Sequence, residues 1–133
     1  MTRLLLITLL LLISSPAYAG WVRIDKTDID KTDDGMTTYV DPDTIRRKGN
    51  LVKIWELFDF KTIQTSQGNL LSRKSQDEYD CAEERRRTLA FMDFSGNMGS
   101  GRVVDRNVDE GKWEPIAPDS VGQVLWKLVC GKK

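Results

Sequence analysis

Paired carboxylates are the residues of this chain whose type and spacing come nearest to a catalytic site. Two carboxyl groups that flank a glycosidic bond can hydrolyse it, one as the acid and the other as the base or nucleophile. Glu56 could face Glu78 or Asp80 on a neighbouring predicted strand, and Asp59 follows on the same strand as Glu56. The sequence has 20 acidic residues among 133, so such pairs arise often by chance. A carboxylate hydrolase is therefore the third of three functional hypotheses.

The absence of histidine removes most other catalytic chemistry. Ser-His-Asp and Cys-His nucleophiles need an imidazole, and most catalytic zinc and iron sites bind one. Cysteine catalysis is also excluded if the two thiols are oxidised. We therefore expect a protein that is not an enzyme and that uses no cofactor.

The N-terminal segment 1–19 has the three parts of a secretory signal peptide. A positive start precedes an unbroken apolar run over residues 4–13, and the segment ends in a small-x-small pattern at Ala19. The run is about ten residues long, whereas a membrane span needs ~20. We expect cleavage between Ala19 and Gly20, which leaves one domain over residues 20–133. That domain is exported, either to the periplasm or to the cell surface.

Two further expectations follow from glycine and cysteine positions. Gly20 stands where a lipid-anchored bacterial protein needs a cysteine, so no lipid anchor is expected. The only cysteines, Cys81 and Cys130, both follow the cleavage point. Because an exported protein meets an oxidising compartment, a disulfide between them is favoured over an intermolecular bridge or two free thiols. It would close a loop of about 50 residues, worth roughly 4 kcal/mol in the chain-entropy description.

The charge balance limits the class of partner. Without its first 19 residues the chain has 114, enough for one domain with a modest core. It then carries 19 basic and 20 acidic residues, and this net charge of −1 does not favour binding to nucleic acid or to an anionic membrane.

Local clusters of arginine could still bind a protein or a polyanion such as glycosaminoglycan or lipopolysaccharide. The candidate patch consists of Arg46, Arg47, Arg85, Arg86 and Arg87. The alternative is that these cations lie on a solvated face and pair with neighbouring acids such as Glu83 and Glu84. Alternation along a strand would also place Arg86 on the face opposite to Arg85 and Arg87.

An aspartate-rich segment imitates a calcium-binding loop. Asp30, Thr32, Asp34 and Gly35, with Asp41 in the twelfth place, follow the spacing of an EF-hand loop. Threonine is a poor replacement for an acid at the third position, and a strand is predicted where the motif needs a helix. We therefore expect a solvated hairpin loop and no metal site.

Alternating apolar and polar residues predict about six strands separated by turns. The strands are expected at 20–25, 36–40, 51–61, 70–80, 85–94 and 102–105. Asp41-Pro42-Asp43 should end the second strand, and Gly49-Asn50 should form a hairpin turn. Residues 81–87 could form a helical turn, although the flanking pattern favours continued sheet. Residues 95–101 contain three glycines and are expected to form a flexible loop or a tight hairpin.

One helix is predicted over residues 119–130. Asp119 or Ser120 can act as its N-cap, and Gly131 ends it. An apolar stripe recurs at helical spacing and consists of Val121, Val124, Leu125, Leu128 and Val129. The predicted fold is therefore α+β, an antiparallel sheet of about six strands with one C-terminal helix laid across a face.

The order and spacing of many short fragments resemble the surface-adhesin protein E family of exported bacterial domains. The fragments are Trp21, Tyr39-Val40-Asp41-Pro42, Ile45-Arg46, Gly49, Val52-Lys53-x-Trp55-x-Leu57, Tyr79-Asp80-Cys81, Arg85, Gly96-x-Met98-Gly99-x-Gly101, Trp113-x-Pro115, Pro118-x-Ser120, Trp126 and Cys130. The resemblance implies an antiparallel sheet with a C-terminal helix, a Cys81–Cys130 disulfide and a homodimer as one candidate assembly. For the adhesin it implies binding to host extracellular-matrix proteins. No family motif marks a catalytic residue.

The leading hypothesis is thus an exported, non-enzymatic binding module of adhesin-like character. The alternative is a periplasmic structural or envelope-accessory protein without a host ligand. The adhesin resembles a lipoprotein at its N-terminus, whereas this chain has Gly20 at the expected cut, which favours periplasmic residence over surface display.

Overall fold

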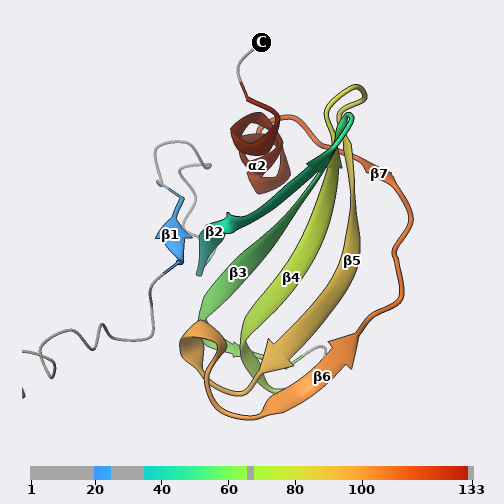
Figure 1. Cartoon of the computed structure of the whole chain (residues 1–133). Helices are drawn as coiled ribbons and strands as arrows, with labels where there is room; N and C mark the ends of the chain where they lie inside the picture. Colours follow the sequence, from blue (N-terminus) through green and yellow to red (C-terminus); the bar gives the residue numbers. More distant parts are fainter. Residues whose placement is uncertain (1–19, 25–34, 66–67, 132–133) are drawn as a thin grey trace, which may run out of the picture.

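A curved antiparallel sheet with one helix over one of its faces forms the molecule (Figure 1). The computed structural model describes residues 20–24, 35–65 and 68–131, so the predicted signal peptide and most of the aspartate-rich loop lie outside it. The elements are β1 (Val22–Arg23), β2 (Met36–Lys48), β3 (Leu51–Gln64), β4 (Leu70–Asp80), β5 (Arg85–Phe94), η2 (Asn97–Gly99), β6 (Val103–Asn107), β7 (Glu114–Pro115) and α2 (Val121–Cys130). This arrangement confirms the predicted α+β fold.

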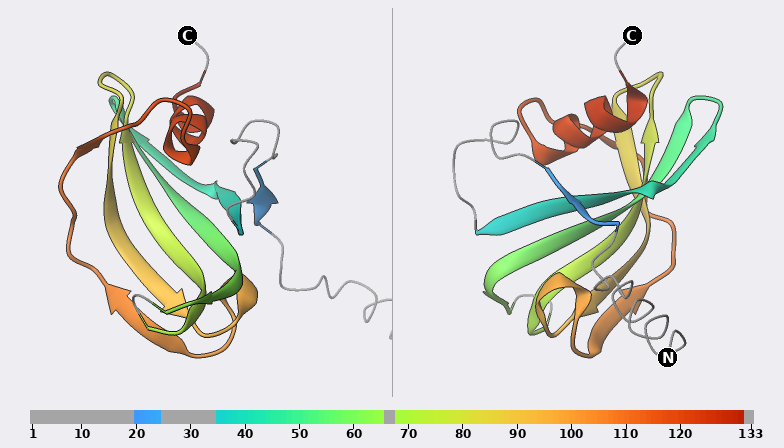
Figure 2. Two further views of the ribbon diagram at one scale, coloured as in Figure 1. Left: turned by 180° about the vertical axis from the view of Figure 1, so that it is seen from behind. Right: turned by 60° about the vertical axis from the view of Figure 1, so that its left-hand side comes forward.

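The sheet is a meander in which each strand pairs with the next one along the chain. The order is β1-β2-β3-β4-β5-β6, every pair is antiparallel, and β7 adds to the end of β5 that β6 leaves free. Helix α2 lies at the end of the sheet where the β2–β3 and β4–β5 turns lie, as Figures 1 and 2 show. None of the helices among the described residues is long and apolar enough to span a membrane.

Helix α2 begins and ends where the sequence predicts. The Ser120 hydroxyl accepts a hydrogen bond from the Gln123 N–H and so caps the first turn. Gly131 follows the last residue with a φ of 74°, a conformation that favours glycine. The apolar stripe is narrower than predicted, because Leu125 and Val129 are buried whereas the side chain of Leu128 is 52% exposed.

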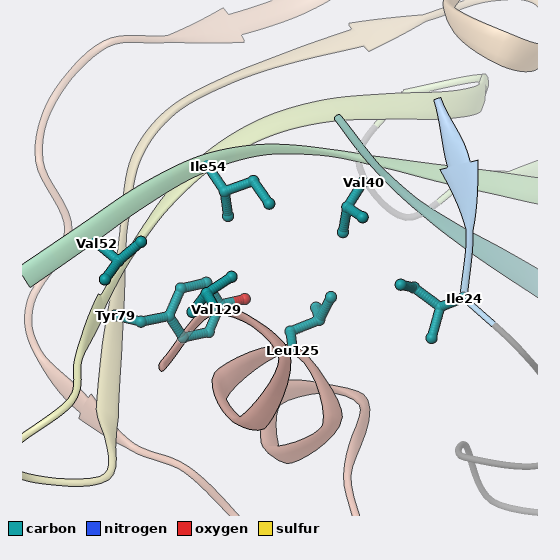
Figure 3. Close-up of a cluster of buried hydrophobic side chains, with 7 residues drawn as sticks. All are labelled: Ile24, Val40, Val52, Ile54, Tyr79, Leu125 and Val129. Atoms are coloured by element: carbon teal, nitrogen blue, oxygen red, sulfur yellow. The ribbon is translucent and has the colours of Figure 1, made fainter. Parts of the chain in front are cut away.

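The main hydrophobic core lies between α2 and the sheet. Seven buried residues form it, drawn in Figure 3: Ile24, Val40, Val52, Ile54, Tyr79, Leu125 and Val129. The Cys81–Cys130 disulfide joins the end of α2 to the residue after β4, with the two Cα atoms 5.4 Å apart. The internal disulfide is thereby confirmed, and it fastens the helix to the sheet beside this core.

The two faces of the sheet are covered differently. We call the face that carries Val52, Ile54 and Tyr79 the helix face, and the other one the opposite face. The connection after β5 folds over the opposite face, where the backbone N–H of Met98 donates to Asp59 and that of Gly99 donates to the Ser72 hydroxyl. The segment 95–101 is therefore the tight hairpin connection between β5 and β6, closed by hydrogen bonds from Ser95 to Arg102 and from Gly96 to Ser100, and it contains a short 3₁₀ turn.

Two local predictions were wrong. Asp41-Pro42-Asp43 does not end β2, because the strand continues past a shift in register between Asp41 and Arg46. Pro42 has no N–H to donate and is tolerated at such a bulge, where the Thr44 hydroxyl accepts the N–H of Trp55 instead. The predicted continuous sheet over 81–87 is interrupted by a tight turn, which the carboxylate of Asp80 stabilises by accepting two backbone N–H groups.

Candidate functional site

The predicted catalytic carboxylates do not face one another. Glu56 lies on the helix face and pairs with Ser75 in the ladder, whereas Glu78 and Asp80 lie on the opposite face. The expectation that Glu56 faces Glu78 or Asp80 is therefore wrong. The β3–β4 register decides this point, because a shift of one residue would move each side chain to the other face. The carboxylate of Asp59 accepts hydrogen bonds from the Asn97 side-chain amide and the Met98 N–H of the 95–101 segment.

Glu56 is instead part of a buried polar cluster on the helix face, together with Asp77 and Tyr79. Its side chain is fully buried, and the Tyr79 hydroxyl donates a hydrogen bond to its Oε1. Burial raises the pKa of Glu56 well above its usual value, and the nearby Asp77 carboxylate raises it further. Burial likewise raises the pKa of Tyr79. A carboxyl group that is shut away from solvent in this way cannot reach a polymeric substrate.

Two of the candidate arginines belong to a stack on the opposite face. Arg85 and Arg87 both contact the Trp113 ring, with guanidinium carbons 4.7 Å and 4.6 Å from the ring centroid. Arg87 Nη2 lies 2.7 Å from Oε1 of Glu78, and Arg85 Nε lies 2.9 Å from Oδ2 of Asp80. Cation–π contacts and buried carboxylates therefore hold both side chains.

Arg86 points to the helix face, as strand alternation predicts. Gly122 of α2 packs against its guanidinium group, since a Cβ at Gly122 would lie 3.3 Å from Cζ of Arg86. The three consecutive arginines of β5 thus have structural partners on both faces. They do not form a free basic patch.

The cations at the tip of the β2–β3 hairpin differ from the arginines of β5, because their side chains are exposed. We call these four exposed cations the basic hairpin: Arg46, Arg47, Lys48 and Lys53. None of them forms an ion pair with a carboxylate in the described part of the chain. Arg46 donates only to backbone carbonyls at residues 43 and 45. The right-hand view of Figure 2 shows this hairpin, coloured cyan to green, projecting from the body of the sheet.

Lys48 and Lys53 are the members of the basic hairpin that the predicted arginine patch did not include. The Gly49-Asn50 turn sets Lys48 opposite Leu51 and Arg46 opposite Lys53, so two cations are directly opposed on one face. A two-residue turn fixes that register, and counting back from Gly49-Asn50 would have found the pair. Like charges in directly opposed positions destabilise a sheet. On its other side Lys53 lies opposite Glu78, which forms its ion pair with Arg87 and not with Lys53.

The fold is similar to that of solved bacterial protein structures. The chain is similar to protein E of Haemophilus influenzae in one crystal form at a TM-score of 0.64 and 12% identity, covering 86% of this chain and 90% of that one. It is similar to protein E from non-typeable Haemophilus influenzae at a TM-score of 0.56 and 12% identity, covering 87% and 78%. A search of curated proteins finds no match.

The sequence profile of one family matches almost the whole described chain. It is that of surface-adhesin protein E, and it aligns with residues 21–131. The match includes both disulfide cysteines, the basic hairpin and helix α2. The chain therefore belongs to the surface-adhesin protein E family.

Proposed function

We propose that this protein is an exported binding module that holds an acidic macromolecule through the basic hairpin. The observation that carries the proposal is the directly opposed pair of Arg46 and Lys53, neither of which forms an ion pair within the described residues. An adhesin is a binding protein and not an enzyme, so family membership agrees with the expectation of a chain without catalytic residues.

Charge compensation favours the basic hairpin over the other arginines as the binding surface. Exposed cations that lack a partner attract an anionic ligand and lose no internal ion pair when they bind it. Arg85 and Arg87 would have to leave Asp80, Glu78 and the ring of Trp113 first. Polyanionic glycans fit this surface well, because closely spaced sulfate or carboxylate groups match closely spaced cations.

Retention on immobilised heparin, a highly sulfated polysaccharide, tests the proposal. The variant carrying Arg46→Gln, Lys48→Gln and Lys53→Gln should elute at a lower salt concentration than the unchanged protein. A matched control loses the same charge from three exposed cations elsewhere, at Arg102, Arg106 and Lys112. Equal loss of retention in both variants, or no retention of the unchanged protein, would refute a specific role for the basic hairpin.

Location decides between the adhesin-like role and the alternative of a periplasmic structural protein. We propose export by cleavage after Ala19, with no lipid anchor because Gly20 stands at the cut. Protease treatment of intact cells should remove a protein displayed at the surface and spare one in the periplasm. Protection of the protein in intact cells, with digestion after the outer membrane is opened, would support the periplasmic alternative.

A further inference from the structure

We propose that removal of the signal peptide creates an ion pair between the new α-ammonium group of Gly20 and the carboxylate of Asp41. The inference rests on the cleavage after Ala19 that is part of the proposed function. The first residue of the mature chain would then be bound to β2 at the edge of the sheet. Cleavage of the signal peptide would add this contact to the fold.

The register of β1 brings residue 20 to Asp41. Val22 pairs with Val40 and Arg23 pairs with Tyr39, so the residues before Val22 run alongside the residues after Val40. At Gly20 itself, the position that a Cβ would occupy lies 3.2 Å from Oδ2 and 3.4 Å from Oδ1 of Asp41. Both carboxylate oxygens therefore face the Cα of the predicted first residue.

Asp41 is held in place but lacks a cation. Its Oδ1 accepts the N–H of Asp43 at 3.1 Å, and its carbonyl accepts the Thr44 hydroxyl at 2.7 Å. These bonds fix the carboxylate at the bulge of β2. Across residues 20–24, 35–65 and 68–131, no side-chain cation lies within ion-pair distance of it.

Hydrolysis of the Ala19–Gly20 bond supplies the missing charge. One water is consumed, Ala19 keeps a carboxylate, and Gly20 gains an amine that is protonated at neutral pH because α-amines have pKa values near 7.7–8.0. The free amine can then rotate about the Cα–C bond into the open Cβ direction. The N–Cα bond is about 1.46 Å long, close to a carbon–carbon bond, so the nitrogen would reach ion-pair distance of Asp41.

Glycine is the residue that permits this arrangement. In the uncleaved chain Gly20 also has a φ of 122°, a region that residues with a side chain rarely adopt. Glycine leaves the Cβ direction empty, so the ammonium group can turn into it without moving a side chain against Asp41. In the unprocessed chain the same nitrogen is a neutral amide, so the attraction to Asp41 exists only after cleavage.

A cycle of N-terminal acetylation and mutation tests the pair. The purified mature protein is acetylated near pH 6.5, where the α-amine reacts before the lysines because its pKa is lower. Melting temperatures are compared for the free and acetylated forms of the unchanged protein, of Asp41→Asn and of Asp43→Asn. Asparagine keeps the acceptor for the Asp43 N–H, and Asp43 is an exposed carboxylate in the same turn with no described side-chain partner.

Acetylation should lower the melting temperature by about 1–4 °C in the unchanged protein and in Asp43→Asn, the range for one exposed ion pair. It should have no effect in Asp41→Asn, and 1 M salt should reduce the effect elsewhere. An equal loss in all three proteins, or no loss in the unchanged protein, would overturn the proposal. A mass showing that the exported chain starts at another residue would overturn it too, without bearing on the heparin experiment.

Discussion

Two pairs of cations on the same face of one sheet have opposite surroundings. Arg85 and Arg87 on β5 contact the ring of Trp113 and bind the buried carboxylates of Asp80 and Glu78. Arg46 and Lys53 on the basic hairpin face each other, and neither forms an ion pair within the described residues. The partners of a cation in the fold therefore decide whether it is available to bind a ligand. Its residue type and its neighbours in sequence do not.

The β5 region is stabilised from several sides. The Cys81–Cys130 disulfide anchors α2, and the indole N–H of Trp126 in α2 donates to the carbonyl of Asp80 at 2.8 Å. The basic hairpin has none of these supports at its tip. Variants in the first region should therefore change stability, and variants in the second should change binding.

Loss of the disulfide should have the largest effect. Replacing Cys81 and Cys130 together by serine removes a closed loop of 49 residues in sequence separation. The expected destabilisation approaches the roughly 4 kcal/mol of the chain-entropy description, and the melting temperature should fall by many degrees. Heparin retention measured below that temperature should stay unchanged. Identical melting of oxidised and reduced protein would contradict the anchoring role of the bond.

Glu78→Gln should have the next largest effect, because it removes the charge of a carboxylate that is 4% exposed and bound to Arg87. We expect a loss of about 1–3 kcal/mol in the free energy of unfolding by urea. Glu110→Gln is the matched control. It touches the same arginine at 3.4 Å but is 64% exposed, so its loss should be near zero. Similar losses in both would show that burial does not distinguish the two acids.

Glu56→Gln should stabilise the protein at neutral pH. Because the folded pKa of Glu56 is raised above its usual 4.5, its contribution to stability is full below that value and is lost as pH rises through the folded pKa. The isosteric amide stays neutral and still accepts the Tyr79 hydroxyl. The gain should be on the order of 1 kcal/mol at pH 7 and should shrink toward pH 4. The gain in the free energy of unfolding is measured at pH 7 and at pH 4. A gain that is smaller at pH 7 than at pH 4 would contradict the raised pKa of Glu56.

Arg46→Gln should have the smallest effect on stability. Removing one of two directly opposed cations should raise the free energy of unfolding by a few tenths of a kcal/mol. Thermal unfolding in low salt checks this expectation, and the gain should disappear at 1 M salt. A clear destabilisation would mean that the hydrogen bonds of Arg46 to the carbonyls of residues 43 and 45 outweigh the repulsion between the two cations.

The sequence predicted the fold better than it predicted the site. Turn residues, strand alternation and the helical spacing of residues 119–130 determine which elements form, and all of these are local signals. The pairing of Cys81 with Cys130 followed from there being only two cysteines. The extension of β2 past Pro42 was missed, because it depends on the Thr44 hydroxyl replacing a ladder partner from another strand.

The site required knowledge of pairing between strands. Arg85 and Arg86 are adjacent in sequence, yet one lies beside Trp113 and the other under α2. The stacking of Trp113 depends on β7, a two-residue strand too short to leave a pattern in the sequence. Lys53 could have been found from the hairpin turn, since its register is local. The burial of Glu56 could not, because it depends on tertiary packing over the helix face.

Two double variants, each measured for stability and for binding, test whether the basic hairpin binds the ligand while the arginines of β5 stabilise the fold. The double variants Arg46→Gln/Lys53→Gln and Arg85→Gln/Arg87→Gln lose the same charge from the same face, and each is measured for melting temperature and for heparin affinity below that temperature. We predict that the first weakens binding by about tenfold or more without lowering the melting temperature. We predict that the second lowers the melting temperature by several degrees and keeps most of the affinity. The reverse pattern, or equal loss of affinity in both, would contradict the account.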